Sequence, residues 1–292
     1  DFAMRWGFGM KQGPFEIWQE AGWKQVAVWV KADIDSGKAL SKAPLPAWVF
    51  DGRDGVHTAE GSWSPKTGKY VPIRDLPVYK RQAFRENVLG SQAPNAATAG
   101  KTLFEDANIR LWTLDDEVVI ASIKSKMHTI SAEVTAGLAK GLEIAEAGYK
   151  GMVIWTQDGP FSAGADLQSM MPAFMSGGGK AIAPFEKQLQ DFMLSLRYSN
   201  VPTVAAMHGL ALGGGCELAV HAAKRVAAME TYVGLVEVGV GLIPGGGGLA
   251  YLARRAAEQV EASKGVSGMV GAELMGFVKE GFQAAAMAKV AT

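Results

Sequence analysis

The sequence has little of what marks a secreted, membrane-spanning or metal-binding protein. Cys216 is its single cysteine, which excludes an internal disulfide and agrees with a reducing compartment. The first residues lack the features of a secretory signal, and no apolar run reaches the roughly eighteen residues of a membrane span. The histidines show no zinc-binding spacing. We therefore predict a protein of the cytoplasm, or of the mitochondrial matrix in a eukaryote, with no membrane insertion and no metal ion.

An excess of charge of one sign is also lacking. Lysine plus arginine and aspartate plus glutamate both number 29, so the net charge gives no long-range attraction to nucleic acid or to an anionic membrane. No nucleic-acid partner is expected, and any anion-binding site must be local. Hydrophobic residues make up 48% of the chain, which is typical of a globular protein, and 292 residues predict about two domains.

Composition divides the chain into two domains joined by a linker. Residues 1–85 are rich in tryptophan, glycine and proline and predict a small, mostly helical domain, with a helix around 15–22 and a hairpin turn at Ser64–Gly68. Residues 86–100 are mostly polar or small and are typical of a linker. Over residues 101–292, strand and helix patterns alternate, which predicts an α/β layer fold.

Apolar patterns in the second domain predict its individual elements. The expected strands are 109–114, 118–123, 151–156 and 203–207, and the expected helices are 131–147, 185–197 and 217–223. The low-complexity run Ser176–Gly179 is predicted to be a mobile loop.

Two glycine-rich stretches, Phe161–Asp166 and Leu212–Glu217, are the most informative part of the sequence. Glycine lets the main chain approach a ligand closely and adopt φ values that a Cβ forbids. A helix that begins after the second stretch would direct its positive dipole end to the same place. Together the stretches could hold an anionic oxygen between two main-chain N–H groups, which would stabilise an enolate or a tetrahedral oxyanion.

Two glutamates lie at the end of the second stretch and beyond it. Glu217 comes after the glycine triplet and Cys216, and Glu237 lies among valines. Each can be interpreted as a partly exposed residue at the end of an element. Alternatively, the two carboxyl groups converge on one water molecule, with one accepting a proton and the other donating one. Spacing alone does not decide between these interpretations.

Three segments in this order and spacing resemble the crotonase superfamily, and specifically its enoyl-CoA hydratases: Phe161–Gln168, His208–Glu217 and Glu237–Gly248. The resemblance implies a spiral of strand-strand-helix units and a coenzyme A thioester as substrate. It also implies an oxyanion hole formed by the N–H groups of Ala165 and Gly214, and a water molecule held by Glu217 and Glu237. The further residues that it implies for substrate binding are Ala163, Asp166, Leu167, Lys126 and Gly213. A solvated lysine is an equal interpretation of Lys126.

The resemblance has consequences for the reaction. Both glutamates are present, which favours syn addition of water to trans-2-enoyl-CoA in fatty-acid β-oxidation over isomerisation, thioester hydrolysis or decarboxylation. This chemistry implies no metal or redox cofactor, with coenzyme A bound only as part of the substrate. Two alternatives stay open: another crotonase reaction such as enoyl-CoA isomerisation, or an inert fragment that is active only in the full-length protein.

The segment Gly7–Trp18 resembles the end of the C-terminal helical domain of 3-hydroxyacyl-CoA dehydrogenases. This implies that residues 1–85 are a remnant of that domain and that the chain is a fragment of a multifunctional β-oxidation protein. No G-x-G-x-x-G follows a strand, so no NAD binding is predicted. The helices that cover the acyl pocket in such hydratases are expected to be truncated, and trimers or larger oligomers are expected of the full-length protein.

The sequence departs from the hydratase pattern at three places. His208 stands where asparagine is usual, Ala222-Ala223 where Cys-Asp is frequent, and Leu249-Ala250-Tyr251 where Thr-Gln-Arg is usual. None of these departures removes a residue that the resemblance places in catalysis.

Overall fold

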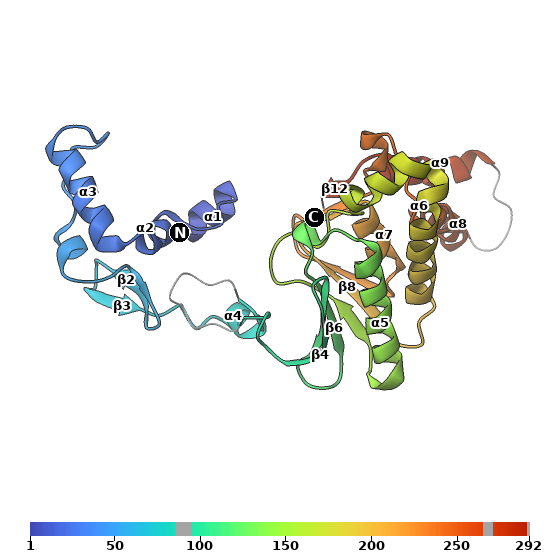
Figure 1. The fold of residues 1–292 in the computed structure, drawn as a ribbon, viewed down its shortest axis with the longest axis horizontal. Coiled ribbons are helices and arrows are strands. Elements are labelled where there is room, and N and C mark those ends of the chain that lie inside the picture. Colours follow the sequence, from blue (N-terminus) through green and yellow to red (C-terminus); the bar gives the residue numbers. More distant parts are fainter. Residues whose placement is uncertain (86–94, 265–270, 291–292) are drawn as a thin grey trace. The chain divides into compact units, whose positions relative to one another are not determined.

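A computed structural model describes residues 1–85, 95–264 and 271–290 of the chain. The chain forms two compact units, Asp1–Ala97 and Thr98–Thr292, which are drawn in Figure 1. The boundary falls within the segment predicted as a linker, of which residues 86–94 lie outside the described residues.

The first unit contains short helices and one antiparallel β-meander. Its elements are α1 (Phe2–Phe8), α2 (Pro14–Glu20), α3 (Trp23–Asp35), η1 (Ala47–Phe50), β1 (His57–Thr58), β2 (Gly61–Ser64), β3 (Lys69–Val71) and α4 (Pro77–Arg81). The expected helix and hairpin turn are both present, and the carbonyl of Ser64 accepts hydrogen bonds from the N–H groups of Thr67 and Gly68. A small core forms around Trp23, whose ring stacks on Trp18 with centroids 4.3 Å apart.

The second unit alternates strands and helices, as expected. Its elements are β4 (Lys101–Glu105), β5 (Ile109–Thr113), β6 (Val119–Ile123), η2 (Lys126–His128), α5 (Ala132–Gly148), β7 (Met152–Ile154), α6 (Leu167–Arg197), β8 (Thr203–Met207), β9 (Leu210–Leu212), α7 (Gly214–His221), β10 (Lys224–Ala227), β11 (Tyr232–Gly234), η3 (Glu237–Val240), α8 (Gly248–Lys264), α9 (Gly271–Ala286) and β12 (Lys289–Val290).

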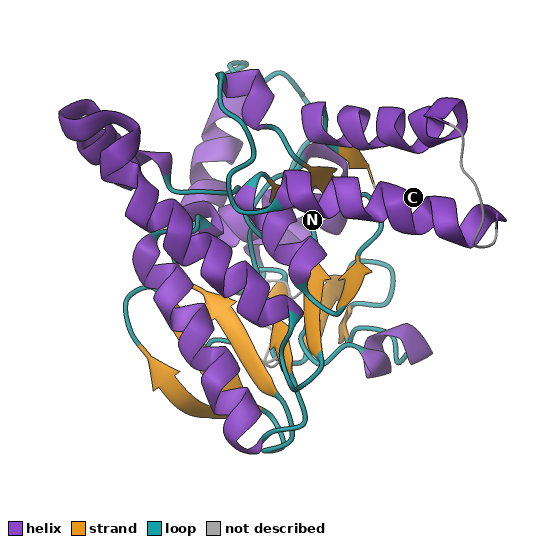
Figure 2. Cartoon of the chain, turned by 90° about the vertical axis from the view of Figure 1, so that its right-hand side faces the viewer, coloured by secondary structure: helices purple, strands orange, loops and turns teal. Residues whose placement is uncertain are grey.

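These elements form the expected spiral of strand-strand-helix turns. The larger sheet has the order β10-β8-β7-β6-β5-β4, and its neighbours from β6 to β10 are parallel. After leaving this sheet, each turn passes through a second, smaller layer, in which β9 pairs with β11 and the bridges Ile130–Ala165 and Ser162–Ala211 join earlier turns. A helix then closes the turn, and Figure 2 shows these helices in purple beside the orange strands. The glycine-rich stretches therefore lie in the smaller layer, at the ends of successive turns.

The main core lies between the larger sheet and the helices α5 and α6, which lie side by side in Figure 1. Helix α5 begins after Ser131, whose hydroxyl accepts a hydrogen bond from the Val134 N–H at 3.3 Å. Its buried residues Val134, Leu138 and Leu142 recur every four positions and form one apolar face. Strand and helix are closely packed there, since a Cβ at Gly137 would lie 2.5 Å from the side chain of Ile109.

Two of the predictions for helices are wrong. Helix α6 begins at Leu167, not at residue 185, and it contains the predicted mobile loop Ser176–Gly179. The Asp166 carboxylate caps the helix by accepting hydrogen bonds from the N–H groups of Gln168 and Ser169. Only Gly178 departs from helical geometry, with φ 59° and ψ −151°, so two helical segments meet there. The glycines that suggested a loop thus mark a break within a helix.

Helix α7 also begins earlier than predicted, at Gly214 rather than at Glu217. Gly213 precedes it with φ 51° and ψ −123°, a conformation that few residues with a Cβ adopt. As a result, the N–H of Gly214 lies in the first turn, where a helix has no internal acceptor for its donors.

Candidate active site

The two glycine-rich turns meet through their main chains. Gly164 has φ 102°, and a Cβ there would lie 2.9 Å from the carbonyl oxygen of Leu212 and 3.4 Å from the nitrogen of Gly214. Conversely, a Cβ at Gly214 would lie 3.4 Å from the nitrogen of Ala165. This approach is possible because neither position carries a side chain. The structure therefore brings together the two residues that were predicted to form the oxyanion hole.

The N–H groups of Ala165 and Gly214 have no hydrogen-bond acceptor among the described residues. Their neighbours do have one: the Asp166 N–H donates to the Ile130 carbonyl at 3.0 Å, and the Gly213 N–H donates to the Gly234 carbonyl at 2.9 Å. The Gly214 donor also benefits from the positive end of the α7 dipole. Two free main-chain donors on adjoining turns suit a ligand oxygen that carries negative charge.

The hydroxyl of Ser162 holds the first of these turns in place through two hydrogen bonds. Ser162 is fully buried, and its hydroxyl donates to the His128 carbonyl at 2.7 Å and accepts from the Gly164 N–H at 3.1 Å. The segment that contains His128 has an unusual backbone conformation, because Met127 and His128 have φ values of 56° and 50°. Non-glycine residues rarely adopt this conformation, so it requires support from the surrounding structure.

Glu217 is buried on α7, with 2% of its surface exposed. Its Oε1 accepts a hydrogen bond from the Gly248 N–H at 2.8 Å, and a Cβ at Gly246 would lie 2.6 Å from its Oε2. Burial raises the pKa of Glu217 to about 7; the negative charges of Glu237 and Glu186 act in the same direction, whereas hydrogen bonds from main-chain N–H groups oppose it. Glu217 can therefore hold or release a proton near neutral pH.

Glu237 begins η3 and is half-buried. Its Oε2 accepts from the Val236 N–H at 2.8 Å, and a Cβ at Gly213 would lie 3.1 Å from its Oε1. Glu237 thus contacts the residue before the Gly214 donor, while Glu217 lies three residues after that donor on the same helix. The structure brings both glutamates to the second glycine turn.

Glu186, on α6, is a third carboxyl group in this region, and the sequence analysis missed it. Its Oε2 is buried without a hydrogen-bond partner among the described residues, and a Cβ at Gly245 would lie 2.5 Å from that oxygen. Burial, and then the charge of Glu237, raise the pKa of Glu186. No motif contains Glu186, and only the tertiary structure brings it to the glycines that follow Glu237.

The residues predicted to bind substrate occupy different settings. Lys126 is exposed on η2 and Leu167 is exposed at the start of α6. Ala163 donates its N–H to the Met127 carbonyl at 3.1 Å, and Gly213 adjoins Glu237. The carboxylate of Asp166 already caps α6. Their contacts with substrate stay a prediction.

Three further observations concern a nucleophile, a metal ion and a membrane span. Burial raises the pKa of Cys216 to about 12, so its thiol stays protonated and is a poor nucleophile. Within residues 1–85, 95–264 and 271–290, no group of three or more His, Cys, Asp or Glu side chains could hold a metal ion. No helix of this described part is long and apolar enough to cross a membrane.

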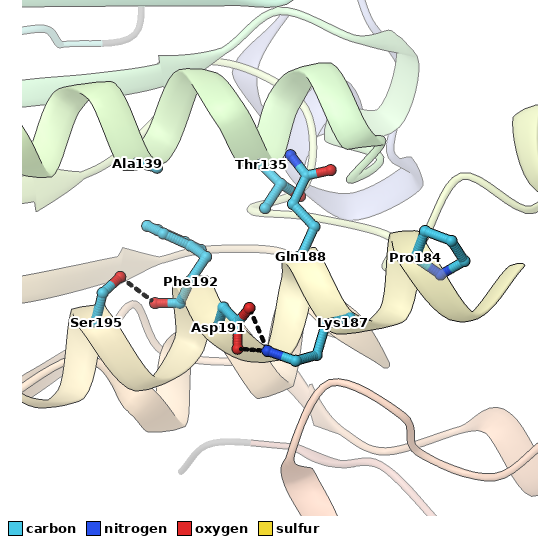
Figure 3. Close-up of a pocket in the computed structure, with 8 residues that line it drawn as sticks. All are labelled: Thr135, Ala139, Pro184, Lys187, Gln188, Asp191, Phe192 and Ser195. Carbon is cyan, nitrogen blue, oxygen red and sulfur yellow. Dashed lines mark hydrogen bonds and ion pairs between the residues drawn. The ribbon is translucent and has the colours of Figure 1, made fainter.

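A separate groove of about 600 Å³ lies between α5 and α6 (Figure 3). Its lining residues are Thr135, Ala139, Pro184, Lys187, Gln188, Asp191, Phe192 and Ser195. Lys187 and Asp191 form an ion pair within it. None of the residues predicted for catalysis or substrate binding lines this groove, so it is distinct from the candidate active site.

Comparison with known proteins identifies the family. Residues 117–268, half of the chain, match the family model described as enoyl-CoA hydratase/isomerase. The chain belongs to the enoyl-CoA hydratase/isomerase family, whose members act on acyl-CoA thioesters. The predicted resemblance to the crotonase superfamily is thereby confirmed.

Individual relatives are similar over most of the chain. A probable 3-hydroxyacyl-CoA dehydrogenase of Bacillus subtilis (strain 168) is 33% identical over 250 residues, which are 85% of this chain and 30% of that protein. A putative fatty acid oxidation complex trifunctional enzyme of Rickettsia prowazekii (strain Madrid E) is 36% identical over 87% of this chain and 31% of that protein. The chain thus spans about a third of the length of these relatives. The matches are longer than the second unit, so they extend into the first.

Other relatives and solved structures match a smaller share of the chain. Human mitochondrial methylglutaconyl-CoA hydratase is 34% identical over 56% of this chain and 50% of that protein. The crystal structure of an enoyl-CoA hydratase from Polaromonas sp. JS666 is 27% identical and covers 58% of this chain and 67% of that one, with a TM-score of 0.46.

Proposed function

We propose that the second unit is an enoyl-CoA hydratase that adds water in the syn sense to trans-2-enoyl-CoA thioesters in fatty-acid β-oxidation. One observation carries this proposal: the free N–H groups of Ala165 and Gly214 adjoin each other, and both Glu217 and Glu237 lie at the same glycine turn. Membership of the enoyl-CoA hydratase/isomerase family supports it.

The donor pair accounts for the activation of the substrate. The thioester oxygen would accept hydrogen bonds from Ala165 and Gly214, which polarises the conjugated system and makes Cβ electrophilic. When the water oxygen bonds to Cβ, negative charge moves to the thioester oxygen, where the two fixed donors stabilise it. Because these donors are part of the main chain, they need no reorganisation during the reaction.

The carboxyl pair accounts for the protons. As the water oxygen bonds to Cβ, one carboxylate accepts a proton from the water, and a proton is then delivered to Cα, so that H and OH are added in total. A carboxyl group with a pKa of about 7, as at Glu217, is suited to such transfers at neutral pH. Because the two carboxyl groups are proposed to act as a coupled pair, we assign the acid and base roles to the pair rather than to either residue.

The proposal includes the binding partners. Addition of water transfers no electrons and its charge is stabilised by main-chain donors, so the proposed reaction uses neither a metal nor a redox cofactor. Coenzyme A enters as part of the substrate, with Lys126 near its phosphates and Ala163, Asp166, Leu167 and Gly213 along the bound thioester.

We also propose a wider context for the chain. The relatives named as dehydrogenase and trifunctional enzyme are about three times as long as this chain and match both units. The proposal is that the first unit ends a hydroxyacyl-CoA dehydrogenase domain within a multifunctional β-oxidation protein. That protein would act in the cytoplasm, or in the mitochondrial matrix of a eukaryote, as a trimer or larger oligomer.

A hydratase assay tests the function directly. Crotonyl-CoA loses its conjugated enoyl-thioester absorbance when water adds. Glu217→Gln and Glu237→Gln keep the side-chain shape but remove the proton-transfer group, and each is expected to lower kcat by about 10²–10⁴-fold. Glu143→Gln, an exposed change on α5, is the matched control and is expected to leave kcat unchanged.

Other outcomes of this assay separate the alternatives. Equal turnover in all four proteins would contradict the assignment. Conversion of a 3-enoyl-CoA without net addition of water would indicate an isomerase. An inert fragment would show no turnover and would release no heat when titrated with an acyl-CoA in a calorimeter.

A further inference from the structure

The carboxyl group of Glu186 is not used in the proposed reaction, yet it contacts the same glycine turn as Glu217. Its Oε2 lies 2.5 Å from the position that a Cβ of Gly245 would occupy. One helical turn later, the Gln190 side-chain amide donates to the Gly245 carbonyl at 2.7 Å. Residues four apart share a helix face, so α6 holds Gly245 at two points.

The other side of this turn holds Glu217. The Gly248 N–H donates to its Oε1 at 2.8 Å, and its Oε2 lies 2.6 Å from the position of a Cβ at Gly246. Gly245 and Gly246 are consecutive, and consecutive α-carbons are about 3.8 Å apart. The carboxyl groups of Glu186 and Glu217 therefore lie against neighbouring residues of one turn.

We propose that Glu186 is a positioning residue of the candidate active site: it contacts the glycine turn that holds Glu217, and its charge contributes to how readily Glu217 releases its proton. This inference depends on the proposed function only for the catalytic use of that proton. The contacts and charges that carry it are properties of the chain itself.

The surroundings of Glu186 contain few other charges. On α7, burial lowers the pKa of His221 and raises that of Cys216, so both side chains are neutral near pH 7. On α6, Lys187 is paired with Asp191 in the groove of Figure 3. On η3, Glu237 adds a negative charge. None of the three glutamates has an ion-pair partner within the described residues, so repulsion among them is not neutralised there.

This repulsion gives Glu186 a measurable effect. Its buried, unpartnered oxygen disfavours the charged form, and when it does ionise, its charge raises the pKa of Glu217. Glu186→Gln keeps the length and planar shape of the side chain but removes the charge. The pKa of Glu217 should therefore fall in this variant.

Infrared titration of the full chain without substrate tests the inference. The carboxyl C=O band of protonated Glu217 is identified by its loss in Glu217→Gln. Its titration midpoint is expected at lower pH in Glu186→Gln than in the unmutated chain, and unchanged in the control Glu143→Gln. The same midpoint in all three proteins, with circular dichroism confirming that each is folded, would overturn the inference.

A second variant separates charge from packing. Glu186→Asp shortens the side chain and keeps the charge, so its midpoint should remain above that of Glu186→Gln. If both variants had the same lowered midpoint, the shift would come from lost packing and the electrostatic role would be wrong. The readout needs no turnover, so a chain inactive on crotonyl-CoA would refute the proposed function while leaving this test intact.

Discussion

The two halves of the candidate active site are built in different ways. The donor half consists of the main-chain N–H groups of Ala165 and Gly214, whose positions depend on glycine conformations in adjoining turns. The acid half consists of Glu217 and Glu237, and the pKa of Glu217 depends on burial and on neighbouring charge. The comparison teaches that one methyl group added at a glycine can displace the donors of the first half without changing any charge. In the acid half, in contrast, a change in a neighbouring charge alters the pKa of Glu217 even when the backbone does not move.

The largest effect is expected from a methyl group in the donor half. Gly164→Ala adds a Cβ that would lie 2.9 Å from the Leu212 carbonyl oxygen, at a φ of 102° that alanine rarely adopts. One of the two turns must shift, and loss of one donor typically costs about 10²–10³-fold in kcat. The assay on crotonyl-CoA is expected to show this loss.

A matched glycine shows whether that loss is specific. Gly179 lies in α6, and a Cβ there would meet nothing within 4 Å. Gly179→Ala is therefore expected to keep full activity. Equal activity of Gly164→Ala and Gly179→Ala would show that the approach of the two turns is not needed for turnover.

The raised pKa of Glu217 should make the free energy of unfolding depend on pH. Burial raises the pKa of Glu217 from 4.5 to about 7 in the folded chain, so the folded state binds this proton more tightly than the unfolded state. Its contribution to stability is fully present below about pH 4.5 and is lost as pH rises through about 7. The full loss is at most of the order of 3 kcal/mol, since one pKa unit corresponds to about 1.4 kcal/mol.

Urea unfolding measures this contribution. Glutamine cannot ionise, so the stability of Glu217→Gln relative to the unmutated chain should increase from pH 5 to pH 8. A difference between the two proteins that does not change with pH would mean that Glu217 has an ordinary pKa in the folded chain.

A smaller effect is expected at Ser162, which links the donor half to the segment before α5. Ser162→Ala leaves the Gly164 N–H and the His128 carbonyl without their partner, at a cost of about 1–3 kcal/mol in unfolding free energy. Ser195→Ala removes an exposed hydroxyl that bonds only within α6 and is the control. If both variants lost the same stability in urea, Ser162 would have no special role in holding the turn.

The sequence predicted most strands and helices of the second unit well because they depend on local patterns, whereas the roles of Ala165 and Gly214 came from the family resemblance and stay a prediction. The strands predicted at 109–114, 118–123 and 203–207 and the helix predicted at 131–147 all form where the apolar patterns indicate them. Gly164 and Gly213 both have positive φ values, which the absence of a Cβ allows. Here short-range chemistry was enough.

Three features did not follow from the sequence patterns. Helix α6 continues past a single break at Gly178, although the composition of Ser176–Gly179 suggested a loop. Glu186 and Gly245 are far apart in sequence, and no pattern connects them. The pKa of Glu217 likewise follows from burial, which only the packed structure provides.

The central claim is that two main-chain donors polarise a thioester carbonyl beside a pair of carboxyl groups. The most direct test is the infrared C=O frequency of an isotope-labelled enoyl-CoA thioester bound to the double variant Glu217→Gln/Glu237→Gln, in which turnover is prevented. The account predicts a lower frequency than in free substrate, and a smaller shift when Gly164→Ala is added. Bound thioester with the frequency of free substrate would contradict it.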